Sequence, residues 1–194
     1  DYVEATRLYS PVLTRNPNPH PRPDEPPFFL TPGDSTKSAL GYNQETSGAV
    51  KITNRSIPNL KLSYQVLFNN IDSRRIRYEY RFNPDGATQQ RAIAFAHGVD
   101  GTYGLGKNTF LDLSFRHNYR HFEDFVYEDV NDKRYDAAGP PVGVASVPGV
   151  IVAGVDFSRY EQATNAFLLK GSLVNQANHQ HQLKAGFEVQ LPEV

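Results

Sequence analysis

The chain has 194 residues, of which 39% are hydrophobic, enough apolar material for one ordinary domain. Its 20 Lys and Arg residues are balanced by 21 Asp and Glu residues, a formal net charge of -1. A nucleic-acid-binding protein needs a basic excess to neutralise phosphates, so we do not expect nucleic acid as a partner. The chain contains no Cys, which excludes disulfides, Cys-ligated zinc and thiol catalysis.

The beginning of the chain resembles the interior of a longer protein. Residues 1–4 include no initiator Met, and no charged segment followed by an apolar run indicates a signal peptide. We therefore expect a fragment. The longest uncharged apolar stretch, residues 140–155, is too short for a transmembrane helix and is interrupted by Gly and Pro. A membrane, if one is involved, would be crossed by strands.

Residues 1–43 are rich in proline. Eight of the 14 prolines fall between Pro11 and Pro32, and Pro17, Pro19, Pro21 and Pro23 alternate with other residues. Proline fixes an extended, non-helical backbone, so we expect an extracellular loop or strap over this region.

From about residue 44 the chain shows period-two alternation, which is typical of strands with two different faces. In residues 59–69, apolar side chains at even positions alternate with mostly polar ones. They are Leu60, Leu62, Tyr64, Val66 and Phe68. The same parity resumes at Ile76, Tyr78, Tyr80 and Phe82. This pattern predicts either one very long strand or one strand with a break.

Further strands are predicted near residues 49–54, 90–103, 165–174 and 182–191, and another follows a short turn at 104–108, giving about six. Short turns near 55–58, 104–108 and 175–180 alternate with long polar links near 83–89 and 129–161. Such asymmetry, with strands long enough for the roughly nine to eleven residues of a membrane crossing, is typical of transmembrane β-barrels. Aromatic residues near the long links, among them Tyr80 and Phe125, suit an interfacial girdle.

Three runs resemble the barrel of TonB-dependent outer-membrane receptors, particularly the type with a carboxypeptidase-regulatory-like N-terminal domain. They are NLKLSYQVLF at 59–68 with FNPDG at 82–86, TFLDLSFRHNYRHFEDFVYEDVNDKRY at 109–135, and FLLKGSLVNQANHQHQLKAGFE at 167–188. The resemblance implies an all-β, antiparallel up-and-down barrel of about 22 strands around a plug, with residues 44–194 as part of the wall. It also implies a bacterial outer-membrane location, a small nutrient as ligand, and a TonB complex contacted through a plug that precedes this chain.

No catalytic, cofactor or metal site is expected. A nucleophile elbow, an H-E-x-x-H motif and a phosphate-binding Gly loop are all absent from the sequence. His117 and His121 lie about 13 Å apart along one strand at ~3.3 Å per residue, too far for one metal ion. Arg75, Arg77 and Arg81 are the candidates for a lumenal face that attracts anionic cargo, although internal pairing with Glu79 is the simpler interpretation.

Two alternatives remain open, a soluble extracellular β-sandwich that binds carbohydrate and, less favoured, a hydrolase domain. A barrel wall and a sandwich differ in what covers the apolar face of each strand. The barrel places these side chains against lipid, whereas the sandwich packs them against protein. The diagnostic residues are Leu60, Leu62, Val66, Leu111, Leu113, Phe187 and Val189.

Overall fold

The structure, a computed structural model, describes residues 3–12, 32–143 and 149–193. It is mostly antiparallel β with little helix, which confirms the predicted all-β class. The chain forms two compact units. The sheet unit comprises residues 45–70, 92–122 and 162–194, and the loop unit comprises residues 1–44, 71–91 and 123–161.

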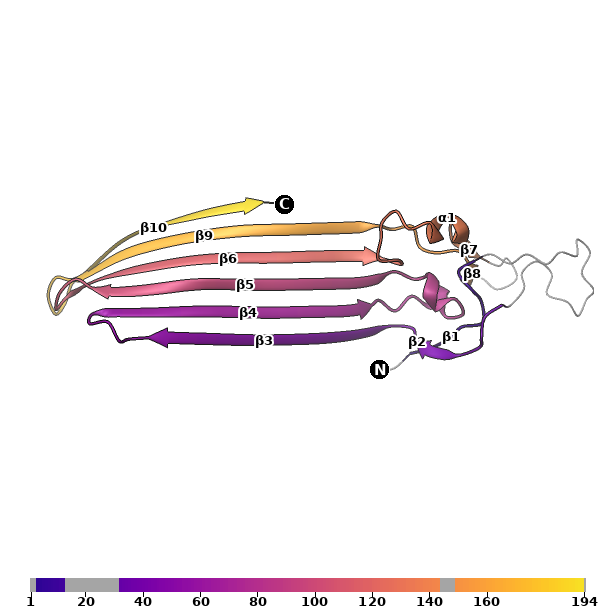
Figure 1. Cartoon of the computed structure of the whole chain (residues 1–194), viewed down its shortest axis with the longest axis horizontal. Coiled ribbons are helices and arrows are strands. Elements are labelled where there is room, and N and C mark those ends of the chain that lie inside the picture. The colour runs from indigo at the N-terminus through magenta and orange to yellow at the C-terminus, as the bar shows by residue number, and fades with distance from the viewer. Residues whose placement is uncertain (1–2, 13–31, 144–148, 194) are drawn as a thin grey trace, which may run out of the picture. The chain divides into compact units, whose positions relative to one another are not determined.

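One six-stranded sheet dominates the structure (Figure 1). Its strands are β3 (Tyr42–Asn54), β4 (Leu60–Arg74), β5 (Gln89–Gly104), β6 (Thr109–Phe125), β9 (Tyr160–Gln176) and β10 (Gln182–Glu193). The spatial order is β10-β9-β6-β5-β4-β3. Sheet strands that follow one another along the chain are therefore also neighbours in space. The sheet is open among the described residues, with β3 and β10 as its edges.

The period-two pattern explains why these segments are strands with distinct faces. Between β9 and β10, Val189 lies opposite Leu169 and Leu191 lies opposite Phe167. One position away the partners are polar, as where Glu188 lies opposite Lys170. Because successive side chains point to opposite faces, this register gathers the apolar residues on one side of the sheet and the charged ones on the other.

The strands contain 12 to 17 residues each, well above the usual five or six. Tight turns at residues 55–59, 105–108 and 177–181 join β3 to β4, β5 to β6 and β9 to β10. Side chains build two of these turns, because Asn54 Oδ1 accepts from Ser56 N–H and Asn178 Oδ1 accepts from the N–H groups of Gln180 and His181. All three turns match the predicted ones.

The loop unit contains its own short elements. They are β1 (Glu4–Thr6) paired with β2 (Lys37–Ala39), the 3-10 helices η1 (Tyr78–Tyr80) and η2 (Pro84–Gly86), α1 (Arg134–Ala138), and β7 (Val142–Gly143) paired with β8 (Ile151–Ala153). Its largest fully buried side chains are those of Tyr80, Tyr135, Leu40, Val152, Val155, Asn83 and Pro84. This unit therefore has a protein core of its own.

Two local expectations are wrong. The alternating stretch at 76–82 does not continue a strand, because β4 ends at Arg74 and η1 follows, with Tyr78 62% exposed and Tyr80 fully buried. The segment at 129–161, expected to be a long polar loop, carries α1, β7 and β8 around buried side chains in its described part. The alternating prolines at 17–23 lie outside the described residues.

Candidate functional site

One face of the sheet unit is apolar and unusually exposed. Leu62 is 38% exposed, Leu113 46%, Phe187 55% and Val189 47%. Other large apolar side chains on these strands are also exposed, including Val50, Ile52, Phe95, Val99, Phe115, Leu169 and Leu191. None of the seven diagnostic residues is buried, so no second layer built from the described residues covers this face.

Rings on this face contact one another across four neighbouring strands. Phe115 of β6 stacks on Phe167 of β9 at 6.2 Å between centroids, and the His117 ring stacks on Phe167 at 4.6 Å. The His97 ring of β5 meets the His117 ring edge-on at 5.2 Å and contacts the Tyr64 ring of β4 at 6.1 Å. These contacts show that the apolar positions of β4, β5, β6 and β9 belong to one continuous surface.

The opposite face is polar and internally paired. Asp100 accepts hydrogen bonds from Ser114 at 2.7 Å and from Arg116 at 2.8 and 2.9 Å. Thr102 donates to Asp112 at 2.7 Å. Because these pairs join neighbouring strands, the charged groups on this part of the polar face already have partners within the sheet.

Small residues hollow out part of the polar face. On β5 these are Ala94, Ala96 and Gly98, and on the edge strand β3 Ala49 is also small. A hollow of about 550 Å³ lies over Ser47, Ala49, Leu67, Asn69, Ala94 and Ala96. Among the described residues, the polar face of the sheet unit therefore has a shallow depression, and no charged side chain lines it.

The three candidate arginines belong to the loop unit, and the structure does not place them on a strand face. Arg77 pairs with Glu79 at 2.7 Å and with Asp156, and its guanidinium lies 4.7 Å from the centre of the Tyr80 ring. Arg81 donates to the carbonyl oxygens of Tyr78 and Gly149. Arg75 uses its backbone N–H to bind Gln90 Oε1.

The environment of Arg77 explains its role. Burial opposes ionisation of Asp156, but hydrogen bonds from Ser158 and the Arg77 guanidinium prevail and lower the pKa of Asp156. The pKa of Glu79 is also lowered, because its own backbone N–H and Arg77 outweigh burial. Burial raises the pKa of Tyr80 to about 12. The Arg77 guanidinium thus forms ion pairs with two carboxylates inside the loop unit. These carboxylates neutralise its charge, which leaves little attraction for an anionic cargo.

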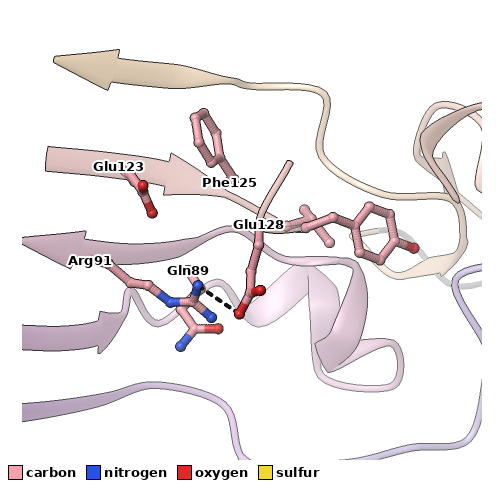
Figure 2. A pocket seen from close by; sticks show the side chains of 7 residues that line it. Gln89, Arg91, Glu123, Phe125 and Glu128 are labelled. Carbon is pink, nitrogen blue, oxygen red and sulfur yellow. Dashed lines mark hydrogen bonds and ion pairs between the residues drawn. The ribbon is translucent and has the colours of Figure 1, made fainter. Parts of the chain in front are cut away.

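The acidic residues near the end of β6 are mostly paired as well. Gln90 donates to Asp124 at 2.6 Å, Arg91 pairs with Glu128 at 3.1 Å, and Arg134 pairs with Asp132 at 2.6 Å. Figure 2 shows Arg91 and Glu128 facing each other beside Gln89. The hollow that they line measures about 10 Å³, room for about one water molecule. It is too small for an organic ligand.

Two predicted girdle aromatics have another role. Tyr80 is fully buried and Phe125 is 5% exposed, so both belong to the core of the loop unit. Sequence reasoning also missed the proximity of His97 to His117. The signal was present, because His97 lies seven residues before the end of β5 and His117 eight residues after the start of β6. A tight turn joins these strands and brings the two positions together.

No helix in the described ranges has the length and hydrophobicity that a membrane crossing requires. No protein-family model matches the chain, and no curated protein or solved structure is significantly similar to it.

Proposed function

We propose that this chain is part of the wall of an outer-membrane β-barrel, within a TonB-dependent receptor that takes up a nutrient such as an iron chelate, a glycan or a peptide. The observation that carries the proposal is the exposed apolar face of one long-stranded sheet. Monomeric soluble proteins rarely leave contiguous apolar patches larger than a few hundred Å² in water, whereas lipid covers such a face at no cost.

Strand length supports a membrane crossing. A β-strand needs about nine to eleven residues to cross when it tilts by about 45°. The shortest strand of the sheet, β10, has 12 residues, and β6 and β9 have 17. Every strand is therefore long enough to cross and to extend beyond the hydrocarbon layer.

The open edges fit one segment of a larger barrel. β3 and β10 each have a single neighbour among the described residues. Unpaired backbone groups cost several kcal/mol each in hydrocarbon, so membrane sheets close on themselves. Additional strands on both edges would satisfy these groups. The large barrel that the resemblance implies would supply them.

The connections fit the receptor class. Three short turns belong to the sheet unit, while the longer connections after β4 and β6 fold into the loop unit. Transmembrane barrels have short periplasmic turns and long extracellular loops, and loops commonly carry ligand recognition. The loop unit would therefore face the outside and contribute to cargo recognition.

A soluble carbohydrate-binding β-sandwich is the second candidate. It requires a partner sheet over the apolar face, and none of the described elements provides one. Single-Cys variants separate the two candidates, because the chain contains no Cys of its own. We would attach nitroxide labels at Leu113, Phe187 and Val189, with Ser114 and Glu188 as matched controls on the other face.

The native protein would first be located by membrane fractionation and gel mobility with and without boiling. A wall predicts a heat-modifiable outer-membrane protein. Its three apolar-face labels should be accessible to oxygen but not to an aqueous nickel chelate, and its two controls should show the reverse. Labels on the apolar face that neither reagent reaches would indicate a protein-packed core and favour the sandwich. A soluble native product would overturn the proposal outright.

A further inference from the structure

Four polar side chains form a hydrogen-bonded row across the apolar face. Tyr64 Oη lies 3.3 Å from His97 Nδ1, and His97 Nε2 lies 3.2 Å from His117 Nδ1. His117 Nε2 lies 3.2 Å from Asn165 Oδ1. The row runs over the neighbouring strands β4, β5, β6 and β9. Two imidazoles in direct contact at its centre are unusual on a face that is otherwise aliphatic and aromatic.

The row lies where the apolar surface becomes polar on β6 and β9. Beyond His117 the same face of β6 continues with Tyr119 and His121. On β9, Asn165 lies opposite Glu193 of β10. Both imidazoles are half-buried. Neither imidazole is therefore enclosed by the described protein, and polar side chains of β6 and β9 lie beside the pair.

We propose that His97 Nε2 and His117 Nδ1 together bind one divalent transition-metal ion of the borderline class, such as Cu²⁺, Ni²⁺ or Zn²⁺. Imidazole nitrogens bind such metals at about 2.0–2.1 Å. At that bond length, the 3.2 Å between the two nitrogens corresponds to an N–metal–N angle of about 100°. This angle lies between the values for square-planar and tetrahedral neighbours, so the separation of the two nitrogens suits one shared ion once the imidazole rings turn toward it.

The outward-facing ring nitrogens already have the partners that a metal site requires. A metal-bound His usually donates its other N–H to an oxygen, which fixes the ring and its tautomer. His117 Nε2–H can donate to Asn165 Oδ1, and His97 Nδ1–H can donate to Tyr64 Oη. Without metal, His97 would carry its proton on Nε2 and donate it to His117. Binding therefore moves one proton from Nε2 to Nδ1 of His97 and releases none.

Packing holds the His117 ring in place. The ring stacks on Phe167 with an interplanar angle of 14°. No carboxylate takes part in the row, so the bound ion would keep its charge, and water would complete its coordination. Among the divalent ions, Cu²⁺ binds nitrogen ligands most tightly, and we expect it to be preferred.

Cu²⁺ titration of the purified native protein, followed by electron paramagnetic resonance, tests this proposal. The expected spectrum shows one ion with two bound imidazoles. His117→Ala and His97→Gln should each remove the two-imidazole signal, and Asn165→Ala should weaken binding roughly 10- to 100-fold, as the loss of such an outer partner does elsewhere. His181→Ala, in the exposed turn between β9 and β10, is the matched control and should change nothing.

Retention of the two-imidazole signal in both His97→Gln and His117→Ala would overturn the proposal, because the metal would then lie elsewhere. Absence of a specific signal in the unmodified protein would overturn it as well. Gel mobility with and without boiling shows whether each variant folds. If a His variant does not fold, Asn165→Ala still tests the site, because it should weaken metal binding without removing a metal ligand. Metal binding is read directly, so the outcome is independent of whether the chain is a barrel wall.

Discussion

Tyr135 in α1 is expected to hold the loop unit closed through its hydroxyl group. The side chain is 1% exposed, and its Oη accepts the backbone N–H groups of Val126 and Tyr127, each at 3.2 Å. Tyr135→Phe removes that oxygen and keeps the ring, which still packs on Tyr127 and Phe157. Two part-buried N–H donors then lose their acceptor.

The expected cost follows from these two donors. A buried donor without a partner costs about 1–3 kcal/mol, and a hydrogen bond contributes about 0.5–1.5 kcal/mol net. Because both donors are only partly buried, we expect a total of about 1–3 kcal/mol in the free energy of opening the loop unit. Each 1.4 kcal/mol is tenfold, so hydrogen exchange at the Val126 and Tyr127 amides should accelerate by about 5- to 150-fold.

Hydrogen exchange of the native protein, resolved to individual amides, is the assay. Tyr127→Phe is the control, because it removes a hydroxyl from the same cluster but leaves the acceptor of the two amides in place. Unchanged protection of both amides in Tyr135→Phe would refute the reasoning. Equal acceleration in both variants would also refute it, since the effect could not then be assigned to the Tyr135 oxygen.

Three other predictions test the structure. Gly154→Ala should destabilise the loop unit by at least about 2 kcal/mol, measured by hydrogen exchange, because the φ of Gly154 is +79° and a Cβ there would lie 2.0 Å from a backbone oxygen. Gly139→Ala is the control and should cost less, because Gly139 has a similar φ of +73° but open space around its Cβ position. Asp156→Asn should lower loop-unit stability at neutral pH. Since the pKa of Asp156 is lowered on folding, its contribution is present above about pH 4, the unfolded value, and lost as pH falls through the folded value, so the two proteins should converge in acid. Lys170→Ala should change denaturant stability by less than about 1 kcal/mol, because both partners of its ion pair are more than half exposed.

Period-two alternation predicted the long strands well because each has one face that differs from the other. The predicted segment at 90–103 is β5 at 89–104, and the one at 182–191 is β10 at 182–193. The turns were also predictable, since Asn, Gly and Ser mark them locally. Whether the sheet closes into a barrel could not be predicted from these patterns, because alternation distinguishes the two faces of a strand and does not determine which strands pair at the sheet edges.

The failed expectation at 76–82 has a physical cause. The alternation of aromatic and charged residues at 76–82 does not correspond to alternating burial, because Ile76 and Tyr78 are exposed whereas Tyr80, of the same parity, is fully buried. Here η1 buries Tyr80 and exposes Tyr78, and Pro84 and Gly86 then form η2. Arg77 consequently pairs inside the loop unit. The His97–His117 pair was missed because the two residues lie on different strands. Their contact depends on how β5 and β6 are aligned with each other, which residue spacing within one strand does not show.

The distribution of buried side chains favours two different surroundings for one chain. Among the described residues, 11 of the 13 buried hydrophobic residues belong to the loop unit, and only Ala92 and Val174 belong to the sheet unit. The loop unit therefore buries its apolar side chains within protein, as a water-soluble domain does. The sheet unit carries equally apolar strands and buries almost none of their side chains. If water covered that face, each large side chain would forgo about 1.5–3 kcal/mol of burial, a loss that a lipid surround removes. This contrast between the two units supports the proposed barrel wall, in which lipid would cover the apolar face of the sheet.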